Sequence, residues 1–379
     1  MMNELQLELK NQLNKFCLSK IEPHMEHDDE TEEFRMSLFN ELGSLGFCGM
    51  TIPEEYGGAG LTYTDSAIAL EEIAKYSVAY AVTVSVSTMV QAIIYDFGNK
   101  SQKEKYLPKL TSGEEIGAFC LSESGAGSDA GSLKTTAKKV DGGYILNGNK
   151  MWITSGGIAK TYIVMARTGG EGSKGISSFI VRDGAPGLSF GKKEKKMGWR
   201  ASPTREVIFE NCFVPDDQRL LAEGEGFKVA MAALDKGRIT IGAVAVGLAQ
   251  RALEESVKYS LTRQQFNQAI FEFQGLQFMM ADMACEIEAS RLLVLEAAKF
   301  YDIGKPNQKI ASFAKLKATD TAMKVTTDAV QILGGVGYTR EYPLERFMRD
   351  AKVLQIVEGT NQVQRVVIAR QLKKEFSKH

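Results

Sequence analysis

Histidine is almost absent from this chain of 379 residues. Its only histidines are His24, His27 and His379, so a Ser-His-Asp triad or a histidine-rich metal centre in the body of the fold is excluded. His24 and His27 lie in an acidic stretch. A metal site there stays open, but a solvated helix end or loop is the interpretation we favour. We therefore expect no metal site.

Net charge, paired cysteines and long apolar runs are also missing. The 46 basic and 47 acidic side chains leave a net charge of −1, which removes the net-charge argument for binding nucleic acid or a membrane surface. The five cysteines are odd in number and form no CxxC pair, which is typical of reduced thiols in the cytoplasm. The N-terminus is too polar for a signal peptide. The longest near-apolar stretch, residues 79–94, is shorter than the ~20 residues of a membrane span and predicts a buried helix.

The hydrophobic pattern divides the chain into three parts. Residues 1–113 have helical periodicity, including a capping box at Ser101 and Glu104. Residues 114–222 contain short β-branched or aromatic runs with no helix between them, which predicts an antiparallel β domain. In residues 223–379 the helical period returns and predicts a helix bundle, with helices over 227–259, 273–300, 309–333, 344–356 and 361–376.

The middle part has clear turn signals. Asp141-Gly142-Gly143 predicts a turn, and Asn147-Gly148 predicts a β-hairpin. The run Gly125-Ala-Gly127-Ser-Asp-Ala nominally matches a dinucleotide fingerprint, but residues 131–140 read as a strand where that fingerprint needs a helix. The loop is either an anion or carbonyl site formed by backbone N–H groups, or a tight turn.

Two further segments suit a flat ligand. Trp152, one of two tryptophans, and Thr154 face the same side of a strand, so a ring and a hydroxyl could meet a heterocycle. The alternative is a core tryptophan. The glycines at 334, 335 and 337 follow a long helix and exceed what a helix cap needs, which would allow another backbone or a phosphate to approach closely.

Glu358 is the strongest candidate for catalysis. It follows the near-apolar run Val353-Leu-Gln-Ile-Val357 and precedes Gly359, with a helix start at Thr360. A carboxyl in such surroundings loses solvation, which raises its pKa above the usual value of about 4.3. A general base that works near neutral pH needs this property. The residues alone leave a structural role open.

Together these segments resemble the acyl-CoA dehydrogenase family. CLSESGAGSDAGS (120–132) and QILGGVGYTREYPLERFMRD (331–350) resemble its two signatures, and VEGTNQVQR (357–365) resembles the segment that bears its catalytic glutamate. TIPEEYGG (51–58) and MWIT (151–154) fall in the expected order, so the resemblance spans the whole chain. The implied fold is an N-terminal helical domain, a central antiparallel β domain and a C-terminal four-helix bundle.

The resemblance implies bound FAD and α,β-dehydrogenation of an acyl-CoA thioester. Glu358 would take the α-proton, while flavin N5 takes the β-hydride and electron-transfer flavoprotein receives the electrons. The thioester oxygen would be held by the Glu358 N–H and a ribityl hydroxyl. The implied FAD contacts are Phe119, Leu121, Ser122, Gly127, Ser128, Trp152, Ile153, Thr154, Arg263, Phe266, Gln274, Gln331, Ile332, Leu333, Gly334, Gly335, Thr360, Asn361 and Gln362. The implied substrate contacts are Ser128, Asp235, Arg238 and Gly359.

Assembly is implied in the same way. Arg263, Gln274 and the segment 331–335 match residues that hold the FAD of a neighbouring subunit, so we expect a homotetramer built as a dimer of dimers. Asn267 replaces the usual glycine of a turn, and we expect that turn to be kept because Asn tolerates a left-handed backbone.

Departures from the family pattern narrow the activity. Gly237 stands where some members carry the base, so the base here must be Glu358. Residues 76–99 contain no Arg or Lys, which argues against glutaryl-CoA. Residues 232–240 resemble short-chain and short-branched members of the fatty-acid β-oxidation enzymes. The competing functions are an oxygen-using acyl-CoA oxidase and a non-catalytic acyl-CoA-binding scaffold.

Overall fold

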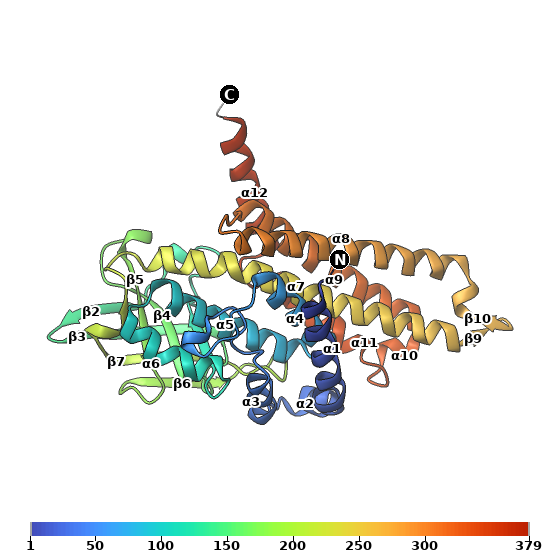
Figure 1. Ribbon diagram of the computed structural model, residues 1–379, viewed down its shortest axis with the longest axis horizontal. Helices are drawn as coiled ribbons and strands as arrows, with labels where there is room; N and C mark the ends of the chain where they lie inside the picture. Colours follow the sequence, from blue (N-terminus) through green and yellow to red (C-terminus); the bar gives the residue numbers. More distant parts are fainter. Residues whose placement is uncertain (1, 378–379) are drawn as a thin grey trace.

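The computed structural model describes residues 2–377, so His379 lies outside it. Three regions follow one another along the chain (Figure 1): a helical region, a β-sheet and a second helical region with very long helices. The sheet lies at one end of an elongated molecule, and the long helices extend from it to the other end. This α-β-α order confirms the predicted fold class.

The first region contains the helices α1 (Glu4–Phe16), α2 (Met25–Thr31), α3 (Met36–Ser44), α4 (Tyr63–Tyr76), α5 (Val78–Phe97) and α6 (Lys100–Thr111). Among residues 2–377, α5 alone has the length and apolar composition of a membrane span, but 89% of its most apolar window is buried inside the fold. The expectation of a buried helix over residues 79–94 is therefore confirmed. The predicted capping box at Ser101 is wrong: Asn99 and Gln102 form it, because the helix begins two residues earlier than predicted, at Lys100.

The second region forms an eight-stranded sheet in the order β6-β7-β3-β2-β4-β5-β8, with β1 added in parallel to β4. Most neighbouring strands are antiparallel, as predicted. The strands are β1 (Gly117–Cys120), β2 (Thr136–Val140), β3 (Gly143–Thr154), β4 (Thr161–Arg167), β5 (Ile176–Arg182), β6 (Leu188–Lys193), β7 (Thr204–Pro215) and β8 (Arg219–Leu220).

Two details of the predicted sheet are corrected. Asn147-Gly148 is not a hairpin: β3 runs straight through it and meets β7 with a bulge there, while the chain reverses at Asp141-Gly142 as also predicted. The strand expected over 131–140 begins only at Thr136. The N–H groups of Lys134 and Thr135 donate to the Glu123 carboxylate instead of to a neighbouring strand.

The third region contains α7 (Gly226–Thr262), α8 (Gln274–Asp302), α9 (Gln308–Leu333), α10 (Gly335–Tyr338), α11 (Leu344–Leu354) and α12 (Asn361–Phe376). Each of the five predicted helices is confirmed, with bounds that match to within three residues. Between α7 and α8 the strands β9 (Gln264–Gln265) and β10 (Gln268–Ala269) form a hairpin. Asn267 is left-handed there, with φ of 64°, so the expected turn is kept.

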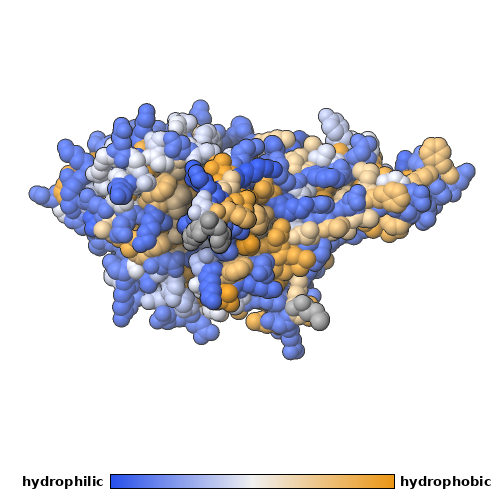
Figure 2. Space-filling model, turned by 90° about the horizontal axis from the view of Figure 1, so that it is seen from above, coloured by the Kyte–Doolittle hydropathy of each residue, from blue (hydrophilic) through white to orange (hydrophobic). Residues whose placement is uncertain are grey.

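Helix α12 projects from the body, and hydrophobic side chains gather on the face of the bundle seen from above (Figures 1 and 2). Phe278 on α8 and Phe376 on α12 are among the exposed large apolar residues. The five cysteines all lie within the described residues and are free, as expected.

Candidate active site

Glu358 lies in the short loop between α11 and α12. It has a left-handed backbone, with φ of 54°, and Gly359 follows with φ of 84°. A glycine adopts this conformation without strain, whereas a glutamate does so at a cost. The two consecutive left-handed residues reverse the chain and turn the Glu358 side chain toward the interior.

The Glu358 carboxylate faces α7 and α5. A β-carbon placed on Gly237 of α7 would lie 2.5 Å from Glu358 Oε2 and 2.8 Å from Met89 Cε of α5. Oε2 is buried and accepts no hydrogen bond from residues 2–377. An unpaired buried carboxylate oxygen is costly, so its presence marks a position where a ligand group is expected.

Electrostatics suit this carboxylate to proton transfer. Burial raises the pKa of Glu358 to about 7, although the positive charges of Arg238 and Lys315 oppose the shift. The predicted rise in pKa is therefore confirmed, together with its cause. The N–H of Glu358 forms no hydrogen bond within the described chain and remains available to a ligand oxygen.

Three side chains secure the Glu358 loop from beneath. Gln364 Nε2 donates to the carbonyls of Glu358 and Gly359 at 3.0 and 2.8 Å. Lys315 Nζ donates to Gly359 O at 3.0 Å and to Asn361 Oδ1 at 2.8 Å. The Asn361 amide donates in turn to Asp320 at 2.6 Å. Hydrogen bonds from residues of α9 and α12 therefore hold the loop that carries Glu358 in place.

The predicted substrate residues are only partly brought together. Arg238 is buried, influences Glu358 electrostatically and is paired with Asp235, which also accepts from Gln308 Nε2 at 3.1 Å. The Gly359 carbonyl is already occupied by the loop contacts. Ser128 is exposed on the glycine-rich loop after β1.

The glycine-rich loop after β1 is not a dinucleotide fingerprint, as predicted, because a 3₁₀ turn at Ala130–Ser132 follows it and no helix begins there. Its start is braced by Glu123, which accepts from Lys150 Nζ at 2.8 Å, while Met151 N donates to Ser122 O at 2.9 Å. These bonds join the loop to the part of β3 that carries Trp152. Phe119 and Ser122 are half-buried, and Leu121 is buried.

Trp152 is not a core residue. Its side chain is 54% exposed, and its backbone is left-handed with φ of 59°, at a bulge where β3 meets β7. Ile153 is buried and Thr154 is half-buried. Nothing lies within 4 Å of a β-carbon placed on Gly125 or Gly127 in the adjoining loop. An exposed ring beside open backbone fits a flat heterocycle.

A second group of predicted cofactor residues lies at the other end of the molecule. Arg263, Phe266 and Gln274 are exposed at the β9–β10 hairpin, which Figure 1 places at the end of the bundle away from the sheet. Helix α10, which follows Gly334, lies toward the same end. Gln331, Gly334 and Gly335 are exposed, whereas Ile332 and Leu333 are buried. The residues around Trp152 and those around the β9–β10 hairpin therefore do not form one site within a single chain.

Thr360–Gln362 lie beside the base. Thr360 caps α12 by accepting from Val363 N, Asn361 is buried with its side chain turned to Lys315 and Asp320, and Gln362 is exposed. All three line an open cleft of about 420 Å³ together with Asp320, Lys352, Gln355, Ile356 and Arg365. The side chain of Asn361 is therefore committed to the protein.

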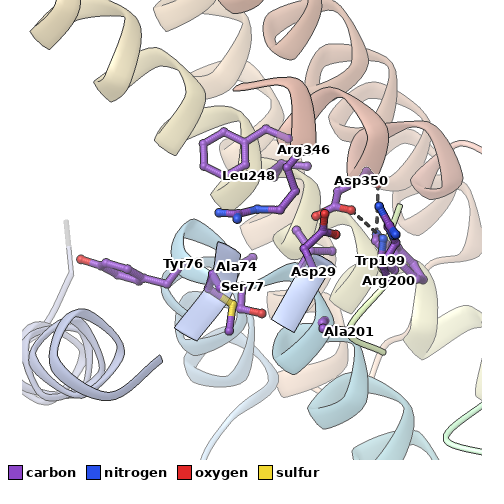
Figure 3. Close-up of a pocket in the computed structure, with 14 residues that line it drawn as sticks. Asp29, Ala74, Tyr76, Ser77, Trp199, Arg200, Ala201, Leu248, Arg346 and Asp350 are labelled. Carbon is purple, nitrogen blue, oxygen red and sulfur yellow. Dashed lines mark hydrogen bonds between the residues drawn. The ribbon is translucent and has the colours of Figure 1, made fainter. Parts of the chain in front are cut away.

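Two other groups of residues do not belong to this site. A cavity of about 20 Å³ between Trp199, Asp350 and Asp29 (Figure 3) contains none of the predicted site residues. His27, Asp28 and Glu33 bring possible metal ligands within 4.8 Å of one another, but Asp28 is already bound by Arg35 at 2.6 Å. His24 lies outside this group.

Sequence reasoning missed Met89, Lys315, Gln364 and the Glu123–Lys150 pair. The burial of Lys315 could have been predicted from the sequence. It shares the helical spacing of Ala311, Ala318 and Ala322, all of which are buried. A lysine on the apolar face of a helix rarely lacks a partner.

Comparisons with known proteins cover nearly the whole chain. Three family models match: "Acyl-CoA dehydrogenase, N-terminal domain" (residues 3–114), "middle domain" (118–212) and "C-terminal domain" (224–373).

Among solved structures, a chain determined in work on the electron transferring flavoprotein of Acidaminococcus fermentans is 48% identical, with a TM-score of 0.97 and 98% of each chain covered. Butyryl-CoA dehydrogenase from Megasphaera elsdenii is 44% identical, with a TM-score of 0.96 over 98% of this chain and 99% of that one. An acyl-CoA dehydrogenase from Bacillus anthracis complexed with FAD is 32% identical, with a TM-score of 0.94 over 100% of this chain and 68% of that one.

Proposed function

Because the chain belongs to the acyl-CoA dehydrogenase family of FAD-dependent oxidoreductases, we propose that it converts an acyl-CoA thioester to the trans-2-enoyl-CoA with Glu358 as the base. The observation that carries this proposal is the buried, unpartnered Oε2 of Glu358 beside Gly237. An acceptor oxygen with a pKa near neutrality can take a proton from carbon and release it to solvent afterwards.

The residues around Glu358 provide space for the substrate and stabilise the charges that form during proton transfer. Gly237 leaves space next to the carboxylate, and Met89 supplies an apolar wall. The free N–H of Glu358 can donate to a thioester oxygen as that oxygen gains negative charge. Arg238, fixed by Asp235, holds positive charge near the carboxylate and stabilises its ionised form before the reaction.

The residues around Trp152 fit the flavin. Trp152 and Thr154 would hold it from β3, with Phe119, Leu121, Ser122, Gly127 and Ser128 from the neighbouring loop and Thr360 and Gln362 from the base loop. FAD supplies the hydride acceptor when bound, and the protein supplies alignment and electrostatics. Ile153 and Asn361 can contribute through their backbones, because their side chains are buried in the protein.

The second cofactor group supports a homotetramer built as a dimer of dimers. The β9–β10 hairpin and α10, which adjoin Arg263, Phe266, Gln274 and residues 331–335, lie toward the end of the molecule away from the sheet that carries Trp152, so these residues would serve the FAD of a neighbouring subunit. Exposed apolar side chains on α8 and α12 offer surfaces for such contacts. We take residues 1–113, 114–222 and 223–379 as the three domains of each subunit.

We propose a short- to medium-chain substrate, electron-transfer flavoprotein as acceptor, fatty-acid β-oxidation as the pathway and the cytoplasm as the location. Similarity to butyryl-CoA dehydrogenase supports the chain length, and similarity to a chain determined in work on an electron transferring flavoprotein supports the acceptor. The exposed Trp152 gives an acceptor a place to approach. Five free thiols suit a reducing compartment.

Anaerobic titration with butyryl-CoA tests the proposal. The purified holoenzyme is expected to lose its yellow colour with butyryl-CoA and to regain it with electron-transfer flavoprotein. Hydrogen peroxide formed at the rate of turnover in air would instead establish an acyl-CoA oxidase. No bleaching with any acyl-CoA from C4 to C16 would overturn the proposed activity and favour a binding scaffold.

A further inference from the structure

Lys315 is a buried cation directly beneath the base loop. The residue is fully buried in α9, and Nζ donates to two neutral oxygens, Gly359 O at 3.0 Å and Asn361 Oδ1 at 2.8 Å. No carboxylate lies within ion-pair distance of it in the described residues. Burying an ammonium group in this way costs free energy, which is reflected in the fall of the Lys315 pKa to about 7 by burial. Such a cost needs a compensating role.

The two acceptors identify that role. Gly359 is the residue after the base, and Asn361 begins the helix that follows. Glu358 and Gly359 both have left-handed backbones, and such a conformation persists when surrounding contacts determine it. Lys315 supplies contacts on the far side of this turn, while Thr319 and Asp320 hold the Asn361 amide in place.

The charges around Lys315 and Glu358 are few. Lys315 faces Glu358 in the base loop, Asp320 on α9 and Arg238 on α7. Glu358 faces Arg238 and Lys315, and α5 contributes the apolar Met89. Arg238 is already paired with Asp235. Lys315 is therefore the positive charge near Glu358 that has no carboxylate bound to it.

We propose that Lys315 is a positioning residue for the general base: its ammonium group fixes the Glu358–Gly359 turn, and its positive charge stabilises the Glu358 carboxylate. This inference rests on the proposed function, because it assigns Lys315 a part in proton abstraction by Glu358. It distinguishes a geometric effect, carried by the two hydrogen bonds, from an electrostatic effect, carried by the charge.

Two variants separate these effects. Lys315→Gln keeps a hydrogen-bond donor but removes the charge, and Lys315→Met removes both. Lys324→Met is the matched control, because Lys324 lies on the same helix but is exposed and paired with Asp328. All three are compared as FAD-loaded protein, with FAD content and thermal unfolding measured alongside.

The readout is exchange of the α-hydrogens in D₂O, followed by NMR on an acyl-CoA analogue with sulfur in place of the β-carbon. This analogue can lose an α-proton but has no β-hydride, so exchange reports the base alone. The exchange rate rises with pH as the base ionises. Removing the charge raises the Glu358 pKa, so this rise moves to higher pH in both Lys315 variants.

The two variants differ in rate above that pH. Lys315→Gln should approach the wild-type plateau to within ~10-fold, whereas Lys315→Met should fall ~10²-fold below it because the turn is no longer fixed. Analogue binding should change little in either. Lys324→Met should match the wild type in every measurement.

Each other outcome counts against one specific claim. If the wild type exchanges no α-hydrogen, the proposed function fails. If the wild type exchanges and both folded Lys315 variants keep its pH dependence and plateau, the role of Lys315 is overturned while the function stands. If neither Lys315 variant folds, Lys315 serves general stability and the proposal is overturned. The same holds if Lys324→Met lowers the exchange rate as much as Lys315→Met does.

Discussion

Glu358 and Gly237 occupy the same small space: a β-carbon on Gly237 would stand 2.5 Å from Glu358 Oε2. Gly237 lies in α7 and Glu358 in the loop between α11 and α12, 121 positions apart in the sequence. Their contact explains why the residue at position 237 is a glycine. A side chain there would displace the carboxylate or block the approach of substrate.

The first prediction follows from this contact. Gly237→Ala places a β-carbon within 2.5 Å of Glu358 Oε2 and 2.8 Å of Met89 Cε, below any ordinary contact distance. The carboxylate must shift, so flavin reduction by butyryl-CoA should slow by ~10²-fold with FAD content unchanged. Gly275→Ala is the control, because nothing lies within 4 Å of a β-carbon there. Full activity in Gly237→Ala would contradict the geometry.

Relocating the base is a second prediction. The structure places both Glu358 and the end of the Met89 side chain opposite Gly237. In Glu358→Gly with Gly237→Glu, the first occupant is gone and the flexible Met89 side chain can move. The double variant should recover measurable activity over Glu358→Gly alone, with an altered chain-length preference. A folded double variant that binds FAD and acyl-CoA but reduces no flavin would show that the two positions do not share one substrate carbon.

Trp152 leads to a third prediction. Because its ring is 54% exposed, Trp152→Ala should leave stability nearly unchanged but weaken FAD binding or reoxidation by the acceptor more than it weakens thioester binding. Trp199→Ala is the contrasting variant: Trp199 is 6% exposed, and its loss should cost ~3–5 kcal/mol of unfolding free energy. An unchanged flavin spectrum and unchanged acceptor kinetics in Trp152→Ala would remove Trp152 from the site.

Assembly supplies a fourth prediction. Arg263→Ala should lower FAD content, and added FAD should shift the wild type toward the tetramer, because a cofactor shared between subunits links binding to assembly by mass action. Light scattering with simultaneous absorbance measures both. A monomer that keeps one FAD per chain would disprove sharing.

The raised pKa of Glu358 leads to a fifth prediction, on stability. A carboxyl group whose pKa rises on folding binds its proton more tightly in the folded state. It therefore costs stability as pH rises above ~4.5, and the cost is complete above about 7. Glu358→Gln should raise the free energy of unfolding by ~3 kcal/mol at pH 8 and by little at pH 4. Denaturant unfolding compares it with Glu210→Gln, an exposed control that should show no such difference.

Local patterns in the sequence predicted most of the fold. The helices of the third region and the burial of α5 follow from periodicity that matches their apolar faces. The hairpin predicted at Asn147-Gly148 is wrong because the signal is local to these two residues. Strand β3 pairs with β2 on one side and β7 on the other, and it continues through Asn147-Gly148. Helix α6 begins at Lys100, with Asn99 as its N-cap, because Asn and Gln form the capping box as well as Ser and Glu do.

Some features of the candidate active site could be predicted from local sequence, and others could not. The raised pKa of Glu358 could be predicted because its apolar neighbours adjoin it in sequence. Its contacts with Gly237, Met89 and Lys315 could not, because they arise where α5, α7 and α9 meet the base loop. The two groups of cofactor residues, around Trp152 and around the β9–β10 hairpin, are separated because the long helices of the bundle lie between them. Hydrophobic periodicity predicts such helices but not their positions in space.

Stopped-flow flavin reduction in Glu358→Gln is the most direct test of Glu358 as the base. The substitution keeps the shape of the side chain but removes its ability to accept the α-proton. With FAD content and butyryl-CoA binding matched to the wild type, anaerobic flavin bleaching should fall by at least ~10²–10⁴-fold. Bleaching within tenfold of the wild-type rate would show that another group abstracts the proton and would contradict the account.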